Sequence, residues 1–152
     1  MAGYGVLPVA VRVKLSVSRS SRTLELVALI NSGYEADTPQ LLVPVSVARE
    51  LGLWPPPSDA EEHVFETAGG PLRVWVVRRA AQVNVVTEDT RSRDVEVDIV
   101  ISPLADEPLI SDVLAGELEL AVEDFAQGLW RFRWEPREKL RRSFPPRRWA
   151  RS

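Results

Sequence analysis

The residues of this sequence that could do chemistry are few, and the most informative are in the triplet Asn31-Ser32-Gly33. The triplet follows the apolar run Leu26–Ile30, and a strand that is apolar on both sides is typical of the centre of a protein. Ser32 could act as a nucleophile, but no general base accompanies it. The carboxamide of Asn31 does not titrate near neutral pH and cannot act as a base. The triplet therefore places an amide and a hydroxyl, which can form hydrogen bonds, in the interior, but it contains no group that transfers protons.

Carboxylates and one histidine are the other candidates. Five acids lie after the triplet and around a later turn: Glu35, Asp37, Asp106, Glu107 and Asp112. Loop acids of this kind are typically solvent-exposed or cap helices. Only Asp37 is kept as an outside candidate, because it is close in sequence to the triplet. His63 is the single histidine, and its place beside a hairpin indicates a surface residue.

Composition excludes several kinds of site. The chain has no cysteine and one histidine, which excludes disulfides, thiolate zinc sites and cysteine catalysis, and leaves a Ser–His–Asp triad unsupported. We therefore expect no metal and no cofactor. The single methionine and two asparagines favour a thermophilic source, since such residues are thermolabile.

Length and hydropathy define the class of protein. A chain of 152 residues with 45% hydrophobic and 27% charged residues is typical of one soluble globular domain. No apolar run approaches the roughly 18 residues of a membrane span, and Met1–Gly5 lacks the charge pattern of a signal peptide. The expected location is the cytoplasm, with no membrane partner.

The elements that must position these residues are mostly strands. Apolar and polar residues alternate along 9–17 and 95–101, which is the pattern of a half-buried strand. Further strands are expected at 24–30, 41–43, 72–79, 81–87, 109–110, 118–122 and 129–134. Short helices are expected at 44–51 and 112–115, the second with Ser111 or Asp112 as its N-cap. Between these elements, His63–Pro71 predicts a hairpin with a mobile Gly-Gly tip.

Four segments, in this order and spacing, resemble the retropepsin-like aspartic peptidases, the single-lobe relatives of retroviral proteases. Leu29–Gly33 stands where that family has two hydrophobic residues followed by Asp-Thr/Ser-Gly. Leu41–Leu53 is similar to the segment after that motif, and Ala68–Gly70 is similar to a flap tip. Pro108–Leu114 is similar to the late hydrophobic-hydrophobic-Gly turn and the helix that follows it.

The resemblance covers residues 9–134 and implies a fold. That fold is an all-β closed barrel of the acid-protease type with one or two short helices. It also implies a symmetric homodimer, because each chain brings one such motif and the active cleft needs two. Ser111 stands where the family usually has glycine, a change that is tolerated where φ is negative.

The resemblance also assigns roles to residues. Asn31 takes the catalytic position, where the family has aspartate, and Ser32 and Gly33 shape its loop. The flap consists of three residues that cover the substrate: Ala68, Gly69 and Gly70. The substrate is an extended polypeptide, laid in the cleft as an additional strand.

Asparagine at position 31 changes what such a cleft can do. Aspartic peptidases need two carboxylates that share one proton, so that one activates water while the other donates to the scissile carbonyl. With an amide in both copies of Asn31 we expect binding with little or no hydrolysis unless aspartate is restored. Three explanations stay open: a natural pseudo-enzyme, an engineered Asp→Asn replacement, or slow deamidation of the Asn-Ser bond that regenerates aspartate.

Charge divides the chain in two. Residues 135–152 hold seven Lys/Arg against two Glu, so this tail carries +5 and the body, 1–134, carries −8 of the total of −3. We divide the chain accordingly into a peptidase-like domain, 1–134, and a basic Arg/Pro-rich tail, 135–152. Arginine mixed with aromatic residues suits nucleic acid, an acidic partner, or the acidic body of the same chain. We favour the last. The alternative function is a non-enzymatic dimeric interaction module whose tail binds an acidic partner or nucleic acid.

Overall fold

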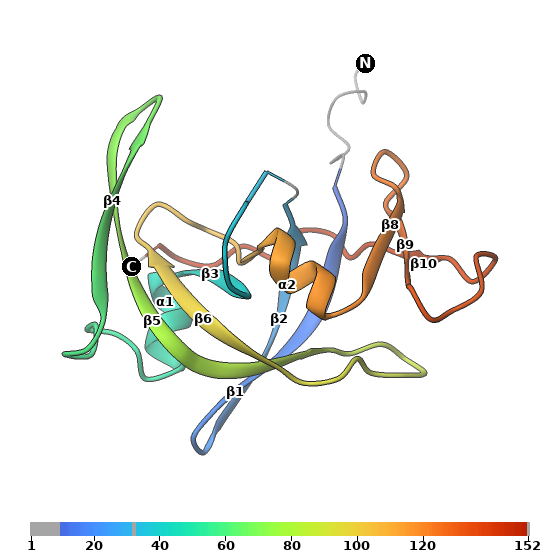
Figure 1. Ribbon diagram of the computed structural model, residues 1–152, viewed down its shortest axis with the longest axis horizontal. Helices are drawn as coiled ribbons and strands as arrows, with labels where there is room; N and C mark the ends of the chain where they lie inside the picture. Colours follow the sequence, from blue (N-terminus) through green and yellow to red (C-terminus); the bar gives the residue numbers. More distant parts are fainter. Residues whose placement is uncertain (1–9, 32, 152) are drawn as a thin grey trace.

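The computed structural model describes residues 10–31 and 33–151, and in that part of the chain it consists of strands with two short helices (Figure 1). In chain order the elements are β1 (Arg12–Arg19), β2 (Arg22–Ile30), β3 (Gln40–Pro44), α1 (Val45–Glu50), β4 (Glu61–Thr67), β5 (Gly70–Val85), β6 (Val95–Ser102), β7 (Leu109–Ile110), α2 (Asp112–Glu117), β8 (Leu120–Asp124), β9 (Leu129–Phe132) and β10 (Arg141–Arg142). The expectation of a mostly-β chain with short helices is confirmed.

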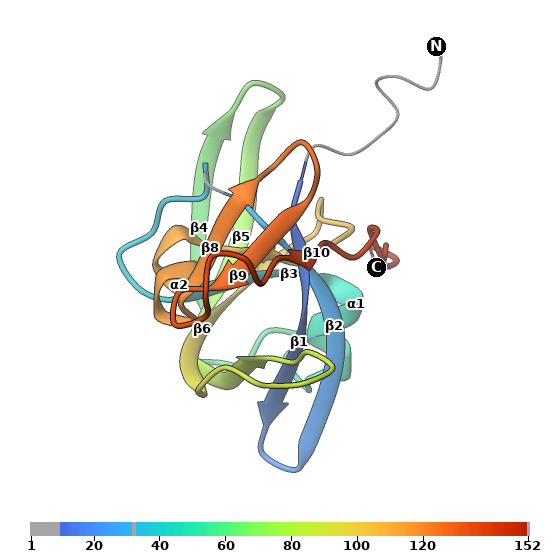
Figure 2. The ribbon, with the colours of Figure 1, turned by 90° about the vertical axis from the view of Figure 1, so that its right-hand side faces the viewer.

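The larger sheet closes on itself. Its strands follow the order β1-β2-β7-β3-β6-β5-β4, and β1 also pairs with β5, so that Leu15 lies between Leu26 and Val85. Alternation along β1 turns Val13, Leu15 and Val17 into the interior, where they are fully buried. β4 is the last strand in this order. It forms a hairpin with β5 that projects from the barrel (Figures 1 and 2).

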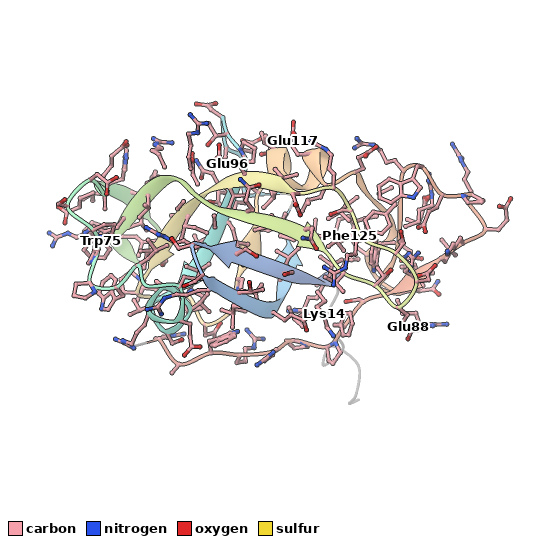
Figure 3. All side chains as sticks on the ribbon, turned by 90° about the horizontal axis from the view of Figure 1, so that it is seen from below. Lys14, Trp75, Glu88, Glu96, Glu117 and Phe125 are labelled. Atoms are coloured by element: carbon pink, nitrogen blue, oxygen red, sulfur yellow. The ribbon has the colours of Figure 1, made fainter. Side chains whose placement is uncertain are left out.

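One long strand replaces two expected ones. The separate strands predicted at 72–79 and 81–87 are a single strand, β5, which runs along the molecule from Trp75 toward the turn that holds Glu88 (Figure 3). The chain contains no Gly or Pro at the expected break. Instead β5 bends at Arg79, whose φ is +49°, and its register with β6 shifts between Val77 and Ala81. A β-bulge of this kind bends a strand without ending it.

Both helices begin near the residues that the sequence indicated. Pro44 is the N-cap of α1, and Gly52, with φ of +75°, follows the end of that helix. The N-cap of α2 is Ser111, whose hydroxyl accepts a hydrogen bond from the Leu114 N–H. α2 continues through Gly116, beyond the end expected from the sequence, until Leu118 is buried in the core. No helix in the described residues is long and apolar enough to cross a membrane.

The basic tail is folded back on the body. β10 lies within the tail and pairs with β9, which extends a second sheet of order β10-β9-β8. Arg141 donates to Asp89 in the β5–β6 turn and to Glu135, and it lies over the ring of Trp130. Further along, Arg148 donates to Asp106 and Glu107. The intramolecular arrangement that the uneven charge favoured is therefore confirmed for these two arginines.

The Arg141–Glu135 contact gives a stability prediction. Glu135 is buried and also accepts the Phe132 N–H at 3.0 Å. Replacing Arg141 by Gln removes the closer of the two cations at this carboxylate and leaves Lys139 at 3.4 Å, so we expect the free energy of unfolding to decrease by about 2 kcal/mol. Arg142→Gln is the matched control, because the Arg142 side chain is exposed and has no hydrogen bond or ion pair with the other described residues, while its backbone pairs with Leu129 as before. Urea denaturation measures the free energy of unfolding of both variants, and equal losses in the two would contradict a stabilising role of the Arg141–Glu135 contact.

The same contact gives a pH dependence. The hydrogen bond from Arg141 is the largest of the effects that hold the pKa of Glu135 below its usual value. In the unfolded chain Glu135 has an ordinary glutamate pKa of about 4.3. As pH falls, Glu135 therefore takes up a proton in the unfolded chain before it does so in the folded one, and stability is lost. We expect the difference between wild type and Arg141→Gln to be full above about pH 5 and to shrink as pH falls below about 4. A difference that stays constant across this range in urea denaturation would show that the carboxylate does not contribute.

Candidate functional site

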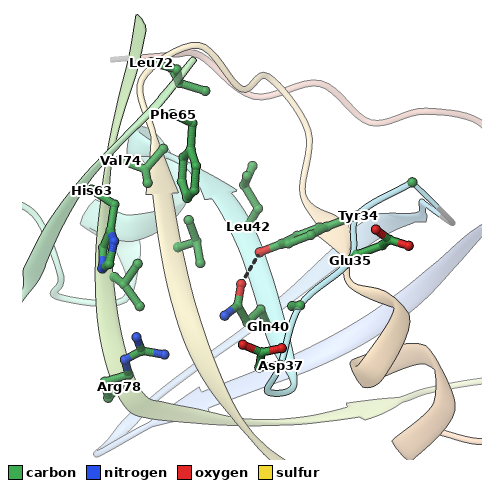
Figure 4. Close-up of a pocket in the computed structure, with 14 residues that line it drawn as sticks. Tyr34, Glu35, Asp37, Gln40, Leu42, His63, Phe65, Leu72, Val74 and Arg78 are labelled. Carbon is green, nitrogen blue, oxygen red and sulfur yellow. Dashed lines mark hydrogen bonds between the residues drawn. The ribbon is translucent and has the colours of Figure 1, made fainter. Parts of the chain in front are cut away.

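A cavity of about 420 Å³ lies between the loop that follows Asn31 and the β4–β5 hairpin (Figure 4). The loop forms one wall through residues 33–37, and the hairpin forms the other through residues of both its strands. Leu42 of β3 and Val100 of β6 lie between the walls. The cavity is large enough to hold a bulky side chain, and it is a candidate site for a ligand of that kind.

Strand register explains the hairpin wall. His63 lies opposite Val74, and Phe65 lies opposite Leu72. Residues directly opposite each other in an antiparallel pair project on the same face, and the next pair on that face is two residues away. All four side chains therefore line the cavity, with the rings of His63 and Phe65 stacked at 6.3 Å. Phe65 is still 51% exposed, which leaves apolar surface for a ligand.

The floor of the cavity is a small apolar cluster outside the barrel core. Val74, Val76 and Val100 are buried together, with Leu42 and Leu72 packed against them. Along β6, Ile99 and Ile101 turn into the barrel, so Val100 must face the opposite side. The central part of the sheet thus has apolar residues on both of its faces. One face packs in the barrel core, and the other forms the floor of the cavity.

The start of α2 holds the loop wall in place. The Ser111 hydroxyl accepts the Gln40 N–H at 3.1 Å, and the Asp112 carboxylate accepts the Ala36 N–H at 3.0 Å. The Asp112 N–H in turn donates to the Tyr34 carbonyl at 2.9 Å. Asp112 therefore has a structural role, as expected for a loop acid.

Tyr34 contributes a polar group to the cleft. Its hydroxyl donates to Gln40 Oε1 at 2.9 Å, as the dashed line in Figure 4 marks. Burial of the ring, with a smaller effect from the charge of Asp98, raises the pKa of Tyr34 above its usual value. The hydroxyl therefore stays protonated and acts as a donor at neutral pH.

One carboxylate joins both walls. Asp98 of β6 is 5% exposed, and it accepts the Arg79 N–H at 2.8 Å, the Thr38 hydroxyl at 2.7 Å and Arg78 Nη1 at 3.0 Å. Burial alone would raise the pKa of Asp98, but these donors outweigh it and hold the pKa below its usual value. Arg78 also donates to Glu61 on β4. Asp98 thus ties the loop to the bend of β5 and, through Arg78, to the hairpin.

Asn31 lies beside the cavity rather than in its wall. Its N–H donates to the Ile110 carbonyl at 3.3 Å, and its Oδ1 accepts the Gly33 N–H at 3.0 Å. This side-chain bond closes an Asx-type turn, and Gly33, the third residue of the triplet, lines the cavity. Ser32 lies outside the described residues.

The other expected site residues divide into two groups. Asp37 and Glu35 line the cavity, as does His63, which also contacts Glu61. Asp106 and Glu107 do not. Glu107 forms a buried ion pair with Arg12, and both acids contact the tail. The expected flap residues form the hairpin turn and are not part of the cavity lining: Ala68, Gly69 and Gly70.

Sequence reasoning missed most of the floor and the Asp98 cluster. Two signals could have found them. The strands at 41–43 and 99–101 are continuously apolar, which is typical of strands that are buried on both faces. Asp98 is the one charged residue in the otherwise apolar run 97–101. An acid in such a run is a candidate for a buried charge, and a buried charge needs hydrogen-bond or ion-pair partners.

A second cavity, of about 430 Å³, lies beneath the tail. Trp130 and Arg141 both line it, but Arg141 and its neighbour Lys139 are already paired with Asp89. No group of three or more His, Asp or Glu in the described residues is placed to hold a metal ion. We take the cavity between loop and hairpin as the candidate site, because an apolar cluster forms its floor and the loop after Asn31 forms one of its walls.

Comparisons with protein-family models and with curated proteins found no match for this chain. The assignment of a function therefore depends on the residues and their geometry.

The three hydrogen bonds to Asp98 predict a strong effect of its removal. We expect Asp98→Ala to lower the free energy of unfolding by about 3 kcal/mol, because it removes a buried acceptor and leaves part-buried donors at Thr38 and Arg79 unpaired. Glu96→Ala is the control, since Glu96 lies two residues away on the same strand and makes only an exposed pair with Arg79. Thermal and urea unfolding compare the two, and similar stabilities of the two variants would contradict the role of Asp98.

Proposed function

We propose that this chain forms a retropepsin-like homodimer that binds extended polypeptide in the cleft between the Asn31 loop and the β4–β5 hairpin. With asparagine at position 31 the cleft binds its ligand and hydrolyses it little or not at all. The observation that carries the proposal is the apolar cavity between these two walls.

Several features of the chain support this proposal. β2 pairs in parallel with β7, so the strand that ends just before Asn31 and the strand that ends just before Ser111 lie side by side. These are the two segments that resemble the motif and the late turn of the family. The third such segment, Ala68–Gly70, forms the turn of the hairpin, and the strands of that hairpin lie across the cavity from the loop that follows the motif.

The hairpin is suited to hold an extended chain. β4 is the last strand in the order of its sheet, and the side chains of His63 and Phe65 face the cavity from it. An extended peptide can add to such an edge through backbone hydrogen bonds while one of its side chains enters an adjacent pocket.

The proposed dimer supplies symmetry to the cleft. A twofold axis would place the two copies of Asn31 facing each other, so that each chain contributes half of the ligand site. Each copy would present an amide, which accepts and donates hydrogen bonds without transferring a proton. The fold accommodates this amide through the bond from the Gly33 N–H.

Restoring the acid tests the proposal. We expect Asn31→Asp to cleave unfolded protein with a rate that increases on acidification and exceeds that of wild type by about 10² to 10⁴. The structural reason is that a carboxylate can accept the same Gly33 N–H, so the loop keeps its shape.

Controls separate chemistry from folding. Asn31→Ala removes the side-chain acceptor without adding an acid, and it must remain inactive. Sedimentation equilibrium establishes whether each variant is dimeric. An Asn31→Asp protein that is folded and dimeric but inert, or a wild type that is monomeric at concentrations where it binds peptide, would contradict the proposal.

A further inference from the structure

The charges around the cleft are unbalanced. Arg78, which lines the cavity, and Arg73, which borders it, are both paired within the protein. Arg78 donates to Asp98 and to Glu61, and His63 contacts Glu61 as well. On the outer side of the hairpin, Arg73 lies 3.6 Å from Glu62. Among the described residues that line the cavity, a carboxylate on a ligand would find no unpaired arginine or lysine.

Two acids on the opposite wall are not balanced in this way. Glu35 and Asp37 line the cavity and are exposed. Neither side chain makes a hydrogen bond or an ion pair with another of the described residues. Figure 4 shows both on the loop wall, with Asp37 across the cavity from Arg78 and Glu35 beyond Tyr34, farther from the hairpin. The loop wall therefore presents uncompensated negative charge beside an apolar floor.

The apolar floor and the acidic wall define one kind of occupant. Leu42, Val74, Val76 and Val100 favour a bulky apolar side chain. Two free carboxylates at the edge of the same cavity favour cationic side chains, and they disfavour acidic ones through like-charge repulsion. We infer that the polypeptide taken by this cleft carries arginine or lysine next to a bulky apolar side chain.

This inference rests on the proposed function, because it specifies the ligand of the same cleft. It does not depend on hydrolysis, since the charges act on binding alone. The basic tail of the same chain has a similar composition but is not the occupant. Three backbone hydrogen bonds hold the tail on the body. The Ser143 N–H donates to the Gly128 carbonyl, the Phe144 N–H to the Arg12 carbonyl, and the Trp149 N–H to the Asp106 carbonyl.

A set of short labelled peptides tests the inference. The peptides share a central Leu-Phe pair and differ only in the residues that flank it, which are arginine, glutamine or glutamate. Fluorescence anisotropy with the unsubstituted 152-residue chain gives a Kd for each. We expect the arginine peptide to bind about tenfold more tightly than the glutamine peptide at low salt, and the glutamate peptide to bind most weakly. The preference must decrease in high salt.

Charge-removing variants locate the source of the preference. In Glu35→Gln/Asp37→Asn, the ratio of Kd values between the glutamine and arginine peptides should fall toward one. The control, Glu25→Gln/Glu88→Gln, removes the same total charge from exposed positions outside the cleft, and it should keep the wild-type ratio. An unchanged ratio in the first variant, or an equal loss in both, would overturn the inference.

The outcomes distinguish this inference from the proposed function. If all the peptides bind the wild type equally well, the charge preference is wrong and the polypeptide-binding cleft stands. If none of them binds at concentrations up to the millimolar range, the polypeptide-binding cleft itself is wrong, and the inference fails with it.

Discussion

The cleft depends on one buried carboxylate. Asp98 lies in the middle of β6, where its neighbours Val97 and Ile99 are buried in the barrel. A charge at this depth is tolerated only when donors surround it, and those donors come from the loop wall at Thr38 and from the bend of β5 at Arg78 and Arg79. Asp98 thus joins two segments that the sequence separates by about 40 residues, Thr38 in the loop wall and Arg78–Arg79 in β5.

The regular part of the fold was predictable because its causes are local. The alternation of apolar and polar residues in β1 and β6 can be recognised from neighbouring residues alone. Ser111 is recognisable as the N-cap of α2 because its own hydroxyl accepts the Leu114 N–H. The bend at Arg79 could not be read in this way. Nothing in its local sequence favours a left-handed φ, and the group that stabilises that conformation is on another strand. The long-range hydrogen bond from the Arg79 N–H is visible in the sequence only at its acceptor, as the acid Asp98 in an apolar run, and not at Arg79 itself.

The candidate site shows the same division. The triplet at Asn31 and the hairpin were identified from short motifs, and Asp37 from its closeness to the triplet. The floor was not, because Leu42 and Val100 look like ordinary core residues in a single sequence. Their apolar runs show that both faces of the strand are covered, but only the pairing of β3 with β6 reveals that one of those faces borders a cavity. The position of the tail was accessible from charge alone, since a +5 segment attached to a −8 body is attracted to it.

Asparagine at position 31 is consistent with the local structure in a way that most other residues would not be. The turn needs a side-chain oxygen two residues before the Gly33 N–H, and aspartate and asparagine both provide one. The two differ in charge. In the proposed dimer, facing carboxylates would repel each other unless they shared a proton, which would make the interface sensitive to pH. Facing amides carry no net charge and avoid this cost. The loop can therefore keep its shape and the proposed interface its stability at neutral pH, while the capacity to activate water is lost.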